Sequence, residues 1–173
     1  MQFNPYGGSA ARLASELVNA GPEARAPAFE EILDRLDYQP RRAVRPDDAA
    51  SLVEWAGRLR EVFREATVPG RVALVNTLLG GVAAAPYISQ HDGRAPHFHY
   101  AEVDAPLVER VKAYTAAGLA HAICEDPNRI GGCARPGCPV VYVDTSRNGR
   151  RRYCSTRCAN RTHVADHRAR RRA

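Results

Sequence analysis

The sequence has no long apolar run, and its first residues do not have the pattern expected of a secretory leader. Its most apolar stretch, residues 72–85, is interrupted by Asn76, Thr77 and two glycines, so we expect no membrane-spanning helix and no membrane partner. Residues 1–8 lack the basic start and the apolar centre of a signal peptide. Together these absences predict a soluble, cytoplasmic protein.

Lysine is almost absent: Lys112 is the only one, so arginine supplies nearly all of the positive charge. The net charge is +6 at pH 7, but it is concentrated at one end of the chain. Residues 147–173 hold ten arginines and a single acid, Asp166, whereas residues 1–146 hold 15 basic and 18 acidic residues. A basic end on a weakly acidic body is expected of a protein whose C-terminal part contacts a polyanion.

Cysteine is also scarce, and four of the five cysteines lie in two close pairs. Four residues separate Cys133 from Cys138, three separate Cys154 from Cys158, and fifteen residues join the two pairs. Such pairs can supply four thiolates to a tetrahedral Zn²⁺ at a low entropic cost of loop closure. We therefore predict one structural zinc ion held by these four cysteines, because four protein ligands leave no open position for a catalytic water.

Disulfide bonds or a redox pair are the alternatives to zinc. The odd number of cysteines and the missing signal peptide argue against disulfides, and redox pairs usually have two residues between their cysteines. Cys124 precedes the cluster and lies on the apolar side of a predicted helix. We expect it to be a core thiol and not a metal ligand.

A length of 173 residues suits one ordinary domain with a small appended module. We predict a mainly α-helical fold with a boundary after residue 128. Residues 1–128 would form a helical N-terminal domain with a small β-hairpin, and residues 129–173 would form a treble-clef-like zinc finger with a basic C-terminal helix.

Helical periodicity predicts one helix after Ser9 and another after Asp104, each residue capping its helix, with two more helices between residues 27 and 66. Residues 72–85 are apolar almost all round as a helix. Such a helix belongs in the middle of a bundle, so we expect it to be buried there.

The pattern changes to extended structure over residues 87–100, where two predicted strands flank a turn at Asp92-Gly93. Alternation places His97 and His99 on one face, and His91 is close in sequence. A second metal site, a ligand site or an enzymatic site is one interpretation of these histidines. Because they lack an acid at a fixed spacing, we favour ordinary strand or surface histidines and expect no enzyme.

Within the zinc module, residues 140–143 form a predicted strand, and a polar turn leads from it to residues 150–153. Ser155 is placed to cap a last helix that carries the second pair of ligands. A zinc knuckle, a hairpin and then a helix with the last ligands is the order of a treble clef.

The motifs of this module resemble those of the CGNR zinc finger. They are Cys133-x4-Cys138, Val143-Asp-Thr-Ser-Arg-Asn148, Arg151-Arg-Tyr-Cys-Ser155 and Cys158-Ala-Asn-Arg161. The chain departs from the family at Ala159, which replaces a glycine, and in the last cysteine pair, which is one residue closer. Either departure can alter the first turn of the last helix.

The region before the module resembles the helical ABATE domain that commonly precedes this finger. The matching motifs are Leu13-Ala-Ser-Glu-Leu-Val-Asn19, His97-Phe-His-Tyr100 and the helix after Asp104. The two resemblances imply a bacterial, stress-induced transcriptional regulator. In that interpretation the zinc finger binds DNA, and the helical domain senses a ligand or binds a partner.

The predicted nucleic-acid contacts lie on the hairpin and on the outer faces of the last helix. In a helical projection Cys158, Thr162, Ala165 and Ala169 share one face, which we expect to lie against the metal and the hairpin. The remaining basic surface is then free to contact phosphates. Its candidate residues are Arg150, Arg151, Arg152, Arg157, Arg161, Arg168 and Arg172.

Alternatives remain open for this surface. The arginines can form a solvated end that binds nothing, and Asn160 and Arg161 can tie the helix to the hairpin, for instance through Asp144, instead of reading bases. The partner we expect is duplex DNA; the competing hypothesis is a zinc-stabilised RNA- or protein-binding adaptor. A homodimer is attractive because one small finger offers little contact area.

Overall fold

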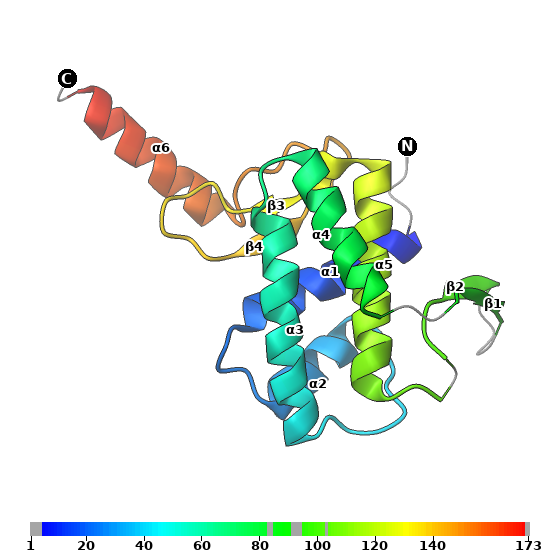
Figure 1. The fold of residues 1–173 in the computed structure, drawn as a ribbon. Coiled ribbons are helices and arrows are strands. Elements are labelled where there is room, and N and C mark those ends of the chain that lie inside the picture. The colour runs from blue at the N-terminus through cyan, green and yellow to red at the C-terminus, as the bar shows by residue number, and fades with distance from the viewer. Residues whose placement is uncertain (1–4, 83–84, 91–94, 103, 172–173) are drawn as a thin grey trace.

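The computed structural model of the protein describes residues 5–82, 85–90, 95–102 and 104–171. In these ranges it is mainly helical, with two small antiparallel hairpins (Figure 1). The elements are α1 (Pro5–Ala20), α2 (Ala26–Arg35), α3 (Pro46–Arg64), α4 (Val68–Gly80), β1 (Tyr87–Ser89), β2 (His97–His99), α5 (Leu107–Glu125), a 3₁₀ turn η1 (Pro127–Arg129), β3 (Ile130–Gly132), β4 (Val141–Val143) and α6 (Thr156–Arg170). The predicted fold class is confirmed.

The centre of the helical part is formed by α1, α3 and α5, and α1 packs most extensively against α5. Gly118 of α5 makes this contact close, because a Cβ there would lie 2.4 Å from the Cβ of Ala10. Trp55 of α3 is 1% exposed, and its indole Nε1 donates to the hydroxyl of Thr115 at 2.9 Å. The core thus holds its single tryptophan in one orientation.

Two predicted caps are wrong. Helix α1 begins at Pro5, so Ser9 lies inside the helix instead of capping it. A proline is well suited to the first turn because its fixed φ is already helical. Asp104 is exposed and pairs with Arg41 at 3.0 Å, while α5 begins only at Leu107.

Helix α4 does not occupy the middle of the bundle, which corrects the prediction for residues 72–85. It begins at Val68, where the Thr67 hydroxyl accepts from the backbone amide of Gly70, and it packs against α3 and α5 with one face. Only Val75 and Leu78 of this helix are buried, and Val72 is 40% exposed. Val68, its first residue, is 42% exposed as well, so apolar side chains of this helix also lie on its outer face.

The predicted strands around residue 88 are confirmed as the β1–β2 hairpin, in which Ile88 is directly opposite Phe98. This hairpin stands off the bundle beside α5 (Figure 1). The predicted turn at Asp92-Gly93 and the histidine at position 91 lie outside the described residues.

The β3–β4 hairpin packs against α1 and α3, and its buried side chains Ile130, Val141 and Val143 belong to the same core as those of the helices. The boundary after residue 128 stays a prediction, and hydrophobic packing crosses it. No helix among the described residues has the length and hydropathy needed to cross a bilayer.

Candidate metal centre

The first ligand pair lies on the turn of the β3–β4 hairpin. Cys133 follows β3 directly, and two residues lie between Cys138 and the start of β4. The backbone amide of Cys133 donates to the carbonyl of Val140 at 2.9 Å, and that of Cys138 donates to the carbonyl of Arg135 at 3.0 Å. These bonds close a tight knuckle that turns both sulfurs to the same side.

The second pair lies at the start of α6. Ser155 is the N-cap, and its hydroxyl accepts from the amide of Cys158 at 3.3 Å, which confirms the predicted cap. Cys154 lies just before the cap and Cys158 in the first helical turn. Their sulfurs are 3.4 Å apart, so the cap fixes the direction of the helix relative to the metal site.

The four sulfurs lie within 4.8 Å of one another. The sulfurs of Cys138 and Cys154 are 3.8 Å apart, and those of Cys158 and Cys138 are 4.0 Å apart. Zinc–sulfur bonds of about 2.3 Å in a tetrahedron require sulfurs about 3.8 Å apart. The donor set therefore fits one Zn²⁺ held by four thiolates, as predicted.

The exposed thiol of Cys124 is not part of this cluster. It was predicted to be a core residue, and that was wrong: the buried side of the last turn of α5 is formed by Ala122 and Ile123.

Close packing of the thiols moves their pKa values apart. The hydrogen bond from Cys154 lowers the pKa of Cys158 to about 6, whereas burial raises the pKa of Cys154 to about 12. The guanidinium of Arg135 lies against the sulfurs of Cys158 and Cys138, and these contacts raise the pKa of Arg135. Its Nε is buried without a hydrogen-bond partner in the described part of the chain. A cation placed here offsets the negative charge that four thiolates bring to a divalent ion.

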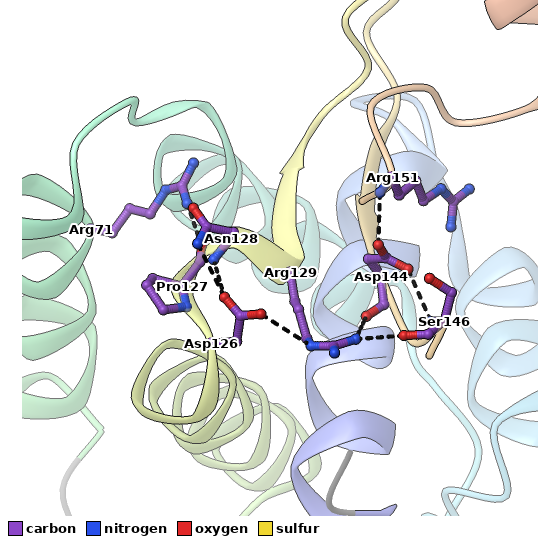
Figure 2. Close-up of polar contacts among 8 residues, drawn as sticks. All are labelled: Arg71, Asp126, Pro127, Asn128, Arg129, Asp144, Ser146 and Arg151. Atoms are coloured by element: carbon purple, nitrogen blue, oxygen red, sulfur yellow. Dashed lines mark hydrogen bonds and ion pairs between the residues drawn. The ribbon is translucent and has the colours of Figure 1, made fainter. Parts of the chain in front are cut away.

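A buried carboxylate organises the loop between the two ligand pairs. Asp144 is 2% exposed, and its two oxygens accept from the backbone amides of Ser146 at 2.9 Å and Arg151 at 2.8 Å (Figure 2). Burial alone would raise the pKa of Asp144, but these hydrogen bonds outweigh it and lower the pKa. The loop that joins the two ligand pairs is thus held by the ionised carboxylate of Asp144.

Arg151 makes its contacts within the zinc finger. Its guanidinium lies 4.7 Å from the ring centre of Tyr142 and donates to the carbonyls of Tyr153 and Cys154. The hydroxyl of Tyr142 donates in turn to the carbonyl of Arg151 at 2.6 Å. This arginine, a predicted nucleic-acid contact, therefore supports the second ligand pair.

Arginines also join the module to the helices (Figure 2). The Nη1 of Arg129 donates to the carbonyls of Asp144 at 3.0 Å and Ser146 at 2.7 Å, and its Nε pairs with Asp126 at 3.4 Å. Gly149, at φ +58°, leaves room for this side chain, because a Cβ there would lie 3.2 Å from the guanidinium carbon. From α4, Arg71 donates to the carbonyl of Pro127.

A further bridge comes from α1. The side-chain amide of Asn19 donates to the carbonyl of Val141 at 2.9 Å and accepts from the amide of the same residue at 2.9 Å. None of Asn19, Arg129 and Arg135 was predicted from the sequence to be part of the site. Their roles depend on contacts between distant segments, for which a single sequence gives no signal.

The module therefore consists of a knuckle, a loop tied to Asp144 and a capped helix with two ligands at its start. Residues 129–171 match the CGNR zinc finger family. The resemblance predicted from the motifs is thereby confirmed for this segment. The resemblance of the upstream region to the ABATE domain stays a prediction, and no curated protein was found to match the chain.

The departures of this CGNR zinc finger from the family leave a regular helix. Ala159 lies in the first turn of α6, and its amide donates to the carbonyl of Ser155 at 3.1 Å. In the last cysteine pair only Cys158 is helical, because Cys154 lies before the Ser155 cap.

Helix α6 extends away from the rest of the molecule after its first turn (Figure 1). Cys158 is its only buried residue, and Thr162 is half-buried and donates to the carbonyl of Cys158 at 3.0 Å. Ala165 and Ala169 are exposed, so the prediction that they lie against the hairpin was wrong. The helix is too long for the small hairpin to cover.

The other predicted nucleic-acid contacts are exposed where they are described. They are Arg150, Arg152, Arg157, Arg161 and Arg168, whereas Arg172 lies outside the described residues. The suggested tie between Arg161 and Asp144 is not formed, because the Asp144 oxygens accept from backbone amides of the loop.

Proposed function

We propose that the protein is a zinc-dependent, DNA-binding transcriptional regulator of bacterial type. In this proposal α6 contacts duplex DNA, and the helical part, which resembles an ABATE domain, senses a ligand or binds a partner. The chain would act as a binding protein and not as an enzyme.

The observation that carries the proposal is the projecting helix. Its 15 residues span about 22 Å at a rise of about 1.5 Å per residue, and B-DNA's major groove, about 12 Å wide, admits a helix. Arg157, Arg161 and Arg168 are exposed along it, and Asp166 is its single acid. Because zinc and the Ser155 cap fix the first turn, the helix would meet the duplex in a defined direction.

A cavity of about 430 Å³ supports the sensing part of the proposal. It lies where the helical part meets the knuckle, and its lining includes Phe63 and Arg71 from the helices and Cys133, Cys138 and Tyr142 from the finger. A small molecule bound there would contact both parts. It could thereby change how the finger is held.

The alternative function is a zinc-stabilised adaptor that binds RNA or an acidic protein. The composition of α6 favours it: Asn160 is the only asparagine or glutamine in the helix, and such amides are the side chains that read adenine. A single finger is also small for specific binding, so the regulator hypothesis carries the expectation of a homodimer on DNA.

The test measures the affinity of the zinc-loaded protein for mixed-sequence duplex DNA, structured RNA and heparin over a range of salt concentrations. For duplex DNA, each lost phosphate contact should lower the slope of log affinity against log salt by about 0.9. Arg157→Gln and Arg168→Gln should each show this loss, whereas Arg12→Gln, at an exposed position of α1, should not. Equal or tighter binding to RNA or heparin, with no preference for any duplex, would favour the adaptor.

A further inference from the structure

Two histidines of the β1–β2 hairpin bring their ring nitrogens together. His97 and His99 are both on β2 and, because side chains alternate along a strand, they share one face. Their Nε2 atoms are 3.0 Å apart, and their ring centres are 4.8 Å apart. The hairpin lies beside α5, and the zinc finger's helix leaves the molecule on another side (Figure 1).

The backbone assigns the tautomer of His97. Its Nδ1 is 2.9 Å from the carbonyl oxygen of Ala95, and a carbonyl can only accept, so Nδ1 carries the hydrogen. In the neutral ring Nε2 then presents a lone pair, and it lies next to the Nε2 of His99. A histidine that donates one ring N–H to a backbone carbonyl and offers the other nitrogen is the usual arrangement of a metal ligand.

The distance between the two Nε2 atoms also suits a shared ion. Metal–nitrogen bonds of about 2.0–2.1 Å place two ligands about 2.9 Å apart at a right angle and about 3.4 Å apart in a tetrahedron. The observed 3.0 Å lies within this range. Without a metal the same pair would share a hydrogen from His99; on metal binding that hydrogen would move to Nδ1 of His99, and no proton would be released.

We propose that His97 and His99 form a second metal site, which binds a divalent transition-metal ion through both Nε2 atoms. Imidazole pairs suit Cu²⁺, Ni²⁺ and Zn²⁺, and they do not suit Ca²⁺ or Mg²⁺, which require oxygen ligands. Water completes the coordination of the ion. This site differs in chemistry from the four-thiolate centre, and nothing in it depends on binding to nucleic acid.

The experiment is a calorimetric titration of the full chain with Ni²⁺, after the four cysteines have been loaded with zinc. Ni²⁺ is chosen because it does not oxidise thiolates. One equivalent should bind, and binding should weaken at least tenfold in His97→Ala and in His99→Gln. His99→Gln keeps a hydrogen-bond donor next to His97 but lacks the imidazole. His167→Ala, at an exposed histidine of α6, is the matched control and should bind as the parent protein does.

Two further measurements accompany the titration. Circular dichroism of each variant shows that the fold is kept, and a colorimetric zinc chelator detects zinc released from the cysteines. Binding of Ni²⁺ that persists in the double variant His97→Ala/His99→Ala, or that releases an equivalent of zinc, would overturn the proposal. Ni²⁺ uptake no greater in the parent protein than in that double variant would overturn it as well.

Discussion

Replacing Asn19 with alanine should loosen the attachment of the zinc finger to the helical part. Asn19 lies in the last turn of α1 and makes two hydrogen bonds of 2.9 Å, as donor and as acceptor, with the backbone of Val141 in β4. Val141 is 2% exposed. Its amide and carbonyl face α1, so the substitution removes their partner without offering a replacement.

The expected cost follows from these two bonds. Each contributes about 0.5–1.5 kcal/mol net, and a buried backbone group left without a partner costs about 1–3 kcal/mol. Alanine recovers about 0.5 kcal/mol through its higher helix propensity. Because Asn19 is itself at the surface, water can reach part of the gap. The net loss should be about 2 kcal/mol, equivalent to about 4–8 °C in Tm for a chain of this size.

Denaturant unfolding of the zinc-loaded protein measures this loss, with fluorescence of the single tryptophan, Trp55, as the probe of the helical core. The control is Asn76→Ala on the exposed face of α4, which should be neutral or slightly stabilising. If Asn19→Ala were as stable as Asn76→Ala, the finger would not be held to the core through this contact.

The remaining predictions concern the metal and the packing. The purified protein should contain about one zinc per chain, which Cys138→Ser should lose and Cys124→Ser should retain; metal analysis showing the opposite would mean that the ligands are misassigned. Arg135→Ala should weaken zinc binding about 10- to 100-fold in competition with a chelator, with partial rescue by lysine, and unchanged affinity would mean that the guanidinium of Arg135 has no role at the metal. Gly118→Ala should destabilise the fold by about 1–3 kcal/mol because α1 is too close, whereas Gly57→Ala, with no atom within 4 Å of the new Cβ, should stabilise α3 by about 0.5–1 kcal/mol. Thermal unfolding that ranked these two variants the other way would contradict the packing of α1 on α5.

The metal site could be predicted from the sequence because the two cysteines of each pair are close together along the chain. Two cysteine pairs, each within one turn or one knuckle, need only short loops to form, and Ser155 caps its helix from the adjacent position. The same is true of α3, whose apolar stripe and proline start are both contained in the segment that forms the helix.

The features that could not be predicted depend on which other segments of the chain pack against them. Composition placed α4 at the centre of the bundle, yet only Val75 and Leu78 are buried, on the face that packs against α3 and α5. Strand β3 is Ile130-Gly-Gly, which has the composition of a linker, and it becomes a strand because Ile130 enters the core and β4 pairs with it. Cys124 has apolar neighbours in sequence but lies outside their buried face.

For the basic surface, the charges could be predicted from the sequence, but the contacts of each arginine could not. The three consecutive arginines, residues 150–152, lie in the loop between β4 and α6 and are all exposed. They are equivalent by composition, but the guanidinium of Arg151 is engaged by the ring of Tyr142 and by two backbone carbonyls. The proposed interface is therefore narrower than the predicted one and is centred on α6.

In the proposed function, zinc positions α6 to recognise duplex DNA. This function is tested most directly by selecting fragments bound by the zinc-loaded protein from a pool of random duplex DNA and repeating the selection with Arg157→Gln. We predict enrichment of a short sequence motif by the parent protein and loss of enrichment by the variant. Recovery of fragments with no common sequence, in the same yield for both proteins, would contradict the proposal.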